Sequence, residues 1–151
     1  MDRVTIIKPF AELSIEELYA ILRFRNEVFV VEQNCIYQDA DNKDPLAFHV
    51  IIKEDDLLVA YARILPAGIS FAEVSIGRVA SGKSARGTGA GRKLMQDSLS
   101  FIAGEFGSCK IRIGAQSYLL SFYRSLGFEV AGANYLEDGI EHVEMTAEIW
   151  N

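Results

Sequence analysis

Cysteine is scarce in this 151-residue chain, and its scarcity excludes several kinds of site. The two cysteines, Cys35 and Cys109, form no Cys-x-x-Cys pair and stand near no histidine cluster. We therefore expect neither structural zinc nor a disulfide framework, and no metal site. Neither cysteine belongs to a nucleophile pattern with a histidine, so a covalent enzyme intermediate is not expected either.

A basic surface and long apolar runs are also missing from the sequence. Lysine and arginine number 15 against 21 aspartate and glutamate, a net charge of −6, so nucleic acid is not an expected partner. Charges interrupt the apolar runs well short of the ~20 residues of a membrane span, so no membrane partner is expected. The first ten residues lack a signal-peptide pattern, and we expect a cytoplasmic protein.

The succession of hydrophobic patterns predicts one α/β domain, residues 1–151, whose sheet mixes parallel and antiparallel strands. Ser14 and Glu17 form a capping-box pattern at the start of a helix of about four turns. The acidic run 39–44 lacks the glycine and the glutamate of a calcium loop, and we interpret it as a solvated polar connection. Strands are expected at 4–7, 48–52, 57–65, 71–79, 111–115, 128–130 and 143–149, with helices over 94–106 and 119–126.

Three alternating glycines form the most informative stretch of the chain, between a strand pattern and a helix pattern. A helix that opens on glycines offers unpaired backbone N–H groups and a partial positive charge, which together favour a pyrophosphate. The arginine that precedes them could add a charge-assisted contact. A flexible turn between strand and helix is the other interpretation. The stretch runs Arg86, Gly87, Thr88, Gly89, Ala90, Gly91.

Two better-known phosphate motifs overlap this stretch. Residues 77–84 fit the P-loop string G-x-x-x-x-G-K-[ST]. A P-loop helix begins near the lysine, here Lys83, but the glycines that follow each cost about 1 kcal/mol inside a helix. The Rossmann pattern G-x-G-x-x-G fails because Arg92 holds its last position. We therefore disfavour the P-loop, which would bind Mg-ATP, and set the Rossmann fingerprint aside.

Two motifs in a fixed order resemble the GNAT superfamily of acyl-CoA-dependent N-acetyltransferases, and the resemblance covers nearly the whole chain. The phosphate motif [Q/R]-x-x-G-x-[G/A] is met by Arg86, Gly89 and Gly91. A second motif, F-Y-x-x-x-G-F, is met by Phe122, Tyr123, Gly127 and Phe128. The stretches 28–35, 113–116 and 135–142 resemble the ElaA-like branch of that superfamily. The resemblance implies a single domain with a splayed central mixed sheet flanked by helices.

The resemblance also implies acetyl-CoA as co-substrate and assigns residues to it. Backbone groups of Val79, Ala80 and Ser81 would pair with the acetyl-pantetheine arm. The backbone amides of Gly87, Thr88, Gly89, Ala90 and Gly91, with Arg86 beside them, would hold the pyrophosphate. Gln116 and Tyr123 complete the expected cofactor contacts, although Gln116 stands where an asparagine is common.

The strand-edge part of this expectation has a physical basis. A pantetheine arm is extended and rich in amides, so it can add to an exposed strand edge through main-chain hydrogen bonds. A glycine inside a strand often marks a bulge or a close approach of another group. We expect a bulge at Gly114 to splay two parallel strands apart and open such an edge.

Acyl transfer to an amine needs an acid, an oxyanion donor and a base. The resemblance assigns Tyr123 as the acid that protonates the leaving thiolate. The N–H of Val79 or a neighbour would be the oxyanion donor. Glu73 is the first candidate base, through a water, and His142 is the second; both have structural interpretations as well. Glu32 could hold a substrate ammonium group.

Direct transfer of acetyl from acetyl-CoA to a primary amine of a small molecule or peptide is therefore the expected function. A noncatalytic acyl-CoA-binding regulatory module is the alternative. His49 is interpreted as a hydrogen-bonded core residue rather than a catalytic one. The last apolar strand and Trp150 could contribute to the edge of a homodimer.

Overall fold

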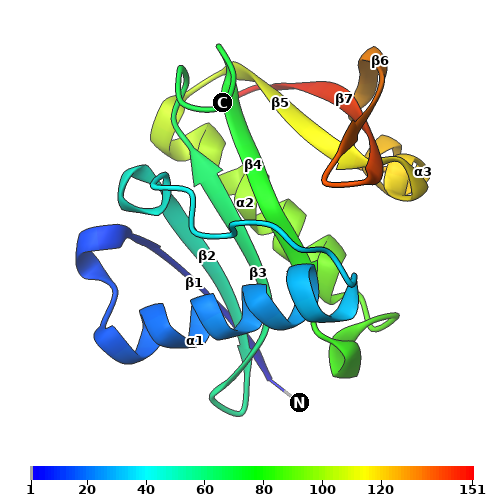
Figure 1. Ribbon diagram of the computed structural model, residues 1–151. Helices are drawn as coiled ribbons and strands as arrows, with labels where there is room; N and C mark the ends of the chain where they lie inside the picture. The colour runs from blue at the N-terminus through cyan, green and yellow to red at the C-terminus, as the bar shows by residue number, and fades with distance from the viewer. Residues whose placement is uncertain (1) are drawn as a thin grey trace.

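Seven strands form one sheet in the order β1-β2-β3-β4-β5-β7-β6 in the computed structural model, which describes residues 2–151 (Figure 1). Neighbouring strands are antiparallel except for β4 and β5, which are parallel. The expected mixed α/β sheet is therefore confirmed. The strands are β1 (Arg3–Pro9), β2 (Phe48–Glu54), β3 (Leu57–Leu65), β4 (Val74–Ser81), β5 (Cys109–Gln116), β6 (Glu129–Glu137) and β7 (Ile140–Ile149).

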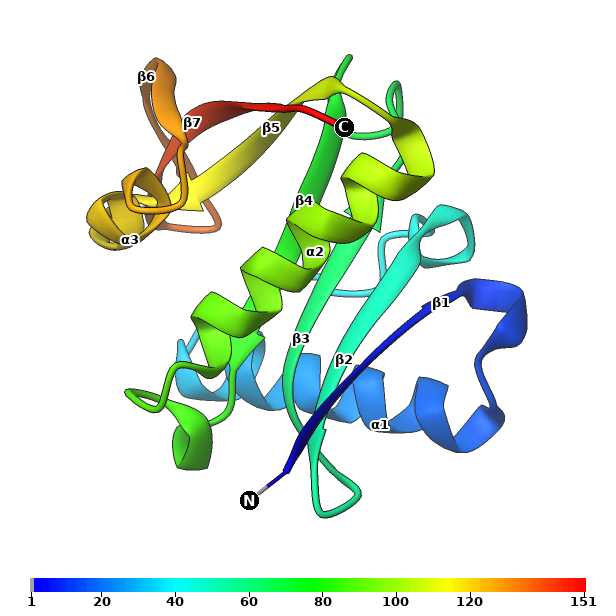
Figure 2. The same cartoon turned by 180° about the vertical axis from the view of Figure 1, so that it is seen from behind.

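Two longer helices cover opposite faces of the sheet, and a third lies beyond β5 (Figures 1 and 2). The helix α1 (Ile15–Arg25) begins at the predicted capping box and continues as a π-helix, η2 (Asn26–Glu32). Across the sheet runs α2 (Ala90–Phe106), and α3 (Leu120–Arg124) is shorter than the predicted helix. Short 3₁₀ turns occur at η1 (Phe10–Glu12), η3 (Asp44–Leu46), η4 (Lys83–Ala85) and η5 (Ser117–Leu119).

Each helix buries an apolar stripe against its face of the sheet. Leu94, Met95 and Ile102 of α2 are fully buried, as their helical spacing predicts, and each contributes about 1.5–3 kcal/mol. A smaller cluster, which includes Ile21 and Phe24, fixes α1 on the other face. Residues 2–151 contain no helix long and apolar enough to cross a membrane.

The acidic connection 39–44 is not the solvated loop that the sequence indicated. Asp39 and Asp44 are buried beside Arg25, whose side chain is fully buried. Arg25 Nε donates to Asp39 Oδ2 at 2.9 Å and Nη1 to Asp44 Oδ1 at 2.7 Å. Arg63 of β3 donates to Asp44 at 2.9 Å and to both carboxylate oxygens of Asp41 at 2.8 Å. The prediction was wrong because the three acids neutralise arginines that are distant in the sequence.

Pairing between β4 and β5 is limited to two residue pairs, Val74–Ile111 and Ser75–Arg112. Beyond them β4 keeps β3 as its partner and the two parallel strands diverge (Figure 1). The expected splayed sheet is therefore present. The divergence of β4 and β5 begins near the amino ends of both strands. Residues 76–81 of β4 therefore have an edge without a β5 partner. We call this segment the β4 edge.

A bulge accompanies the divergence, but it lies in β4 and not at Gly114. Two residues of β4, Arg78 and Val79, stand opposite one residue of β3, and Arg78 has φ +51°. Gly114 pairs regularly with Glu144 of β7. The glycine instead admits a side chain, because a Cβ there would lie 2.5 Å from Tyr135 Oη. Of the two roles expected for Gly114, close approach is correct and the bulge is wrong.

The last strand cannot supply the dimer edge that the sequence suggested. Strand β7 lies between β5 and β6 and pairs with both, so its backbone groups are already used. The outer strands of the sheet are β1 and β6. Trp150 is exposed beyond the end of β7.

The buried ion cluster makes a prediction about stability. Asp44→Asn leaves the buried Arg25 and Arg63 with too little negative charge and should lower the free energy of unfolding by about 3–5 kcal/mol. The exposed pair Arg23–Glu27, 3.8 Å apart, supplies the control, because Glu27→Gln should change stability by less than about 0.5 kcal/mol. Urea unfolding of both variants measures the difference, and equal effects would contradict the importance of the cluster.

The same variant predicts how stability depends on pH. Burial works to raise the pKa of Asp44, but hydrogen bonds from Arg25 and Arg63 outweigh it and hold that pKa below its usual range. A depressed folded-state pKa stabilises the protein above the unfolded value, about 3.9, and the benefit is lost as the pH falls through the folded value. The gap between Asp44→Asn and the unaltered protein should therefore narrow below pH ~4.

Candidate active site

The carboxyl ends of β4 and β5 lie apart, and each strand leads toward a helix. After β4 the chain passes through η4 and the glycines to α2, whereas β5 passes directly into η5 and α3. Phe122 of α3 approaches the start of α2, since a Cβ on Gly91 would lie 3.8 Å from its ring. The β4 edge, the glycine stretch and α3 therefore form one neighbourhood.

The glycine stretch forms the turn that precedes α2. Gly87 and Gly89 have φ +74° and +88°, which glycine adopts without the steric penalty of other residues. Helix α2 begins at Ala90, and its N-cap Gly89 has no side chain to bond the first N–H groups. The 17-residue helix thus presents unpaired N–H groups and the positive end of its dipole at an exposed surface.

The Arg86 side chain makes hydrogen bonds to other residues of the same chain. Its Nε donates to the carbonyl oxygen of Ser81 at 3.0 Å, and Nη2 pairs with Glu32 at 3.0 Å. Lys83 Nζ lies 3.9 Å from the same carboxylate. Glu32, which the sequence offered as a holder of a substrate ammonium group, therefore faces two cations of the protein.

The P-loop interpretation fails on the position of the helix. Lys83 belongs to the turn η4 and its side chain is exposed, whereas α2 begins seven residues later at Ala90. A P-loop lysine follows its glycine directly at the helix start, where it reaches the outer phosphates. Within residues 2–151 no group of three histidine, cysteine, aspartate or glutamate side chains could hold a metal ion.

Tyr123 lies on α3 and is almost completely buried. Its ring packs edge-on against Phe122 and Phe128, with centroids 5.2 and 5.9 Å away. Burial raises the pKa of its hydroxyl, and the neighbouring Tyr118 raises it further, so the phenol is protonated at neutral pH. Arg92 of α2 fixes α3 by donating to Ser125 Oγ at 2.8 Å.

His142 and Gln116 stand opposite each other at the carboxyl end of β5. They are partners in the β5–β7 register, and the Gln116 amide bonds to that of Gln33 at 3.1 Å. His142 is buried, with Nδ1 2.7 Å from the carbonyl of Ile140. A carbonyl only accepts, so Nδ1 carries the proton and Nε2 is the acceptor nitrogen of the neutral ring. Glu137 lies 3.5 Å from Nε2.

Glu73 lies just before β4, where β4 and β5 are still paired. Arg112 of β5 donates to both its carboxylate oxygens, at 3.1 and 3.2 Å, and to Glu144 of β7 at 2.8 Å. The hydrogen bonds from Arg112 lower the pKa of Glu73. By strand alternation, Arg112, Gly114 and Gln116 point to one face, which also carries Glu144 and His142. We call these five residues the polar face of β5 and β7.

Sequence reasoning missed several members of this neighbourhood. Arg112 and Glu144 were not singled out, and Gln33 and Tyr135 entered only as parts of family stretches. A signal existed for Glu144, because polar residues alternate with the apolar ones along the last strand. Nothing local marks Arg112 or Gln33, whose partners come from other elements. His49 was interpreted correctly: both ring nitrogens are hydrogen-bonded, to Tyr61 Oη at 2.6 Å and Asp44 O at 3.0 Å.

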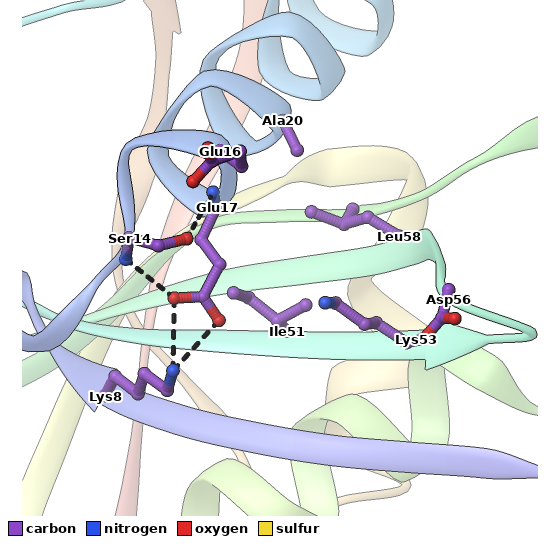
Figure 3. A pocket seen from close by; sticks show the side chains of 9 residues that line it. All are labelled: Lys8, Ser14, Glu16, Glu17, Ala20, Ile51, Lys53, Asp56 and Leu58. Atoms are coloured by element: carbon purple, nitrogen blue, oxygen red, sulfur yellow. Dashed lines mark hydrogen bonds and ion pairs between the residues drawn. The ribbon is translucent and has the colours of Figure 1, made fainter.

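A surface groove lies away from this neighbourhood, between α1 and the β2–β3 hairpin. Ser14, Glu17 and Lys8 form a connected set at one side of it, with Lys8 Nζ 3.0 and 3.1 Å from the Glu17 carboxylate oxygens (Figure 3). Lys53 and Ile51 follow along the groove (Figure 3). Ser14 and Glu17 at its rim form the capping box of α1, and Lys8 is paired with Glu17.

Comparison with known proteins agrees with the geometry. Residues 12–149 match the family model described as an acetyltransferase (GNAT) domain. Protein ElaA of Escherichia coli K12 is 42% identical over 141 residues, which are 92% of each chain. The crystal structure of E. coli ElaA superimposes with a TM-score of 0.92 at 39% identity, covering 97% of this chain and all of that one.

A second solved structure gives the same result. The crystal structure of an acyl-CoA N-acyltransferase from Pseudomonas aeruginosa also has a TM-score of 0.92, at 37% identity over 97% of this chain and 99% of that one. The match to the family model spans nearly the whole sequence, as do both relatives. The chain therefore belongs to the GNAT acetyltransferase domain family.

Proposed function

We propose that this protein transfers an acetyl group from acetyl-CoA directly to a primary amine of a small molecule or peptide. The observation that carries the proposal is the β4 edge, which has no β5 partner and leads into the glycine stretch at the amino end of α2. An extended amide-rich chain with a pyrophosphate at one end fits both features. Acetyl-CoA supplies the thioester whose acyl carbon the amine attacks.

The β4 edge and the glycine stretch would each bind a different part of the cofactor. Val79, Ala80 and Ser81 would pair with the pantetheine arm through backbone groups. The amides of Gly87, Gly89, Ala90 and Gly91 would hold the pyrophosphate, whereas the Thr88 N–H, which donates to the Ala85 carbonyl at 3.3 Å, would have to exchange that partner to join them. Arg86 would have to exchange Glu32 for a phosphate oxygen, and Gln116 lies at the end of the opposite strand.

Tyr123 serves as the general acid and a backbone N–H at Val79 as the oxyanion donor. A buried phenol keeps its proton at neutral pH, so it can donate to a thiolate as the C–S bond breaks. The bulge at Arg78 and Val79 interrupts the regular ladder with β3, and an N–H freed there would be the donor to the carbonyl oxygen.

His142 is the better placed of the two candidate bases. Its Nε2 is the acceptor nitrogen of the neutral ring and can take the amine proton, and the Glu137 carboxylate lies 3.5 Å from that nitrogen. Glu73 is bound on both oxygens by Arg112 and has a lowered pKa, which weakens it as a base. The reaction then needs no covalent intermediate, because the amine attacks the thioester directly.

Ligand binding and turnover test the function itself. Acetyl-CoA and CoA at about 100 times Kd should stabilise the protein by about 2.7 kcal/mol, whereas Mg-ATP should not. Release of free thiol from acetyl-CoA should then depend on an added amine, screened as polyamines, amino acids and short peptides. Binding without amine-dependent thiol release would favour the noncatalytic acyl-CoA-binding module instead.

Replacement of Tyr123 by phenylalanine tests the acid. Tyr123→Phe should lower kcat by about 100-fold or more, with little change in the KM for acetyl-CoA, because the proton donor acts only in the transition state. Tyr118→Phe is the matched control, since Tyr118 lies on the neighbouring turn with an exposed side chain. Full turnover in Tyr123→Phe would remove the tyrosine from the mechanism.

The two candidate bases can be separated by neutral replacements. His142→Gln should lower kcat/KM for the amine by about 100-fold, whereas Glu73→Gln should lower it only a few-fold. Both variants should keep the Kd for CoA, measured by calorimetry, because neither side chain belongs to the cofactor contacts. The opposite ranking would assign the base to Glu73.

A further inference from the structure

We propose that Arg3, in the first strand, positions the phosphate-binding turn for the cofactor. This inference rests on the proposed function, because it concerns how the glycine stretch meets the pyrophosphate of CoA. Arg3 stands outside both sequence motifs and 85 residues from the turn that it contacts. Its role is to orient one peptide group, so that an N–H and not a carbonyl faces the ligand.

The contacts of Arg3 join β1 to the turn directly. Arg3 Nη1 donates to the carbonyl oxygen of Thr88 at 3.0 Å, and Nη2 donates to Thr88 Oγ1. Nε donates to Glu54 of β2 at 2.6 Å, which fixes the plane of the guanidinium. Both views place the amino end of β1 at the same end of the molecule as the segment between β4 and α2 (Figures 1 and 2).

Planarity of the peptide bond converts this contact into a direction for the next N–H. Every described peptide bond is trans, so the carbonyl of Thr88 and the N–H of Gly89 point in opposite directions. Arg3 holds that carbonyl, and the N–H of Gly89 therefore points away from β1. A carbonyl turned outward instead would present negative charge to a pyrophosphate.

The turn needs such a restraint because its glycines would otherwise allow other arrangements. Gly87 and Gly89 on either side of Thr88 adopt positive φ, and glycine populates both signs of φ readily. Thr88 is held on a second side, since its N–H donates to the carbonyl of Ala85 at 3.3 Å and its hydroxyl donates to the same oxygen. With Arg3 in place the turn is organised before the ligand arrives, which favours binding.

The pairing of Arg3 with Glu54 indicates that Arg3 acts through the directions of its N–H groups and not through its positive charge. The Glu54 carboxylate offsets the positive charge, and only 22% of the Arg3 side chain is exposed. The two N–H groups of one planar fork reach the carbonyl and the hydroxyl of a single residue, an arrangement that a lysine ammonium does not reproduce. Arginine is therefore required at this position, and a positive charge alone does not replace it.

Binding of three ligands to four proteins tests the inference by calorimetry. The ligands are acetyl-CoA, its 3′-dephospho form and S-acetyl-pantetheine, which has no pyrophosphate. The proteins are the unaltered chain, Arg3→Ala, Arg3→Lys and Arg23→Ala, a control in which an exposed arginine of α1 is removed. Arg3→Ala should weaken acetyl-CoA and the dephospho form alike, by about tenfold or more, because the pyrophosphate meets a disordered turn.

S-acetyl-pantetheine should bind equally to Arg3→Ala and to the unaltered protein. Arg3→Lys should resemble Arg3→Ala in its affinity for all three ligands, and Arg23→Ala should bind all three as the unaltered protein does.

Equal binding of acetyl-CoA by Arg3→Ala and the unaltered protein would overturn the inference, as would equal losses for acetyl-CoA and S-acetyl-pantetheine. Full rescue by lysine would reduce the role to charge, and a loss confined to acetyl-CoA would assign Arg3 to the 3′-phosphate; either overturns the positioning role. An unaltered protein that binds no CoA would overturn the proposed function instead.

Discussion

The short pairing between β4 and β5 is the constraint on which the other features of the site depend. A strand in the middle of a sheet normally satisfies its backbone groups on both sides, and β4 does so on the β5 side for only two residues. The remaining edge must be bonded by water or by a ligand. A chain that carries amides, such as the proposed pantetheine arm, can satisfy such an edge, and the glycine stretch that follows β4 would extend the same surface to the pyrophosphate. Fold and cofactor preference thus have one origin.

The buried ion cluster keeps this edge in place. Arg78, the bulged residue with φ +51°, donates to Asp39 at 2.9 Å, and a non-glycine residue in that conformation costs about 1–2 kcal/mol. Asp39 also binds Arg25 of α1, so the bulge, the helix and the connection 39–44 share one set of charges. Because charges buried without partners are strongly destabilising, the cluster forms as a unit, and the strained bulge forms with it.

Local signals explain what the sequence could predict, and distant partners explain what it could not. The capping box of Ser14 and the glycine turn were predictable because each is complete within a few residues. The motifs around Arg86 and Tyr123 gave the family for the same reason. The charge cluster was mistaken for a solvated loop, and the bulge was placed at Gly114 rather than Arg78, because both depend on contacts between elements far apart in the chain. The role of Arg3 was not predicted for the same reason, because the residue that it contacts lies 85 positions away in the chain.

Charge is divided along the site in a way that suits two different substrates. One end has the positive terminus of α2 with Arg86 and Lys83, whose charges Glu32 offsets in part, and an anionic cofactor would be favoured there. The polar face at the other end carries Glu144, with Glu137 beside His142, and Arg112 offsets Glu73 and Glu144 only in part. A cationic amine would approach this second end, drawn also by the net charge of −6. The amine proposed as acceptor would have to lose a proton before it attacks, so the proposed mechanism needs a base at that end of the site.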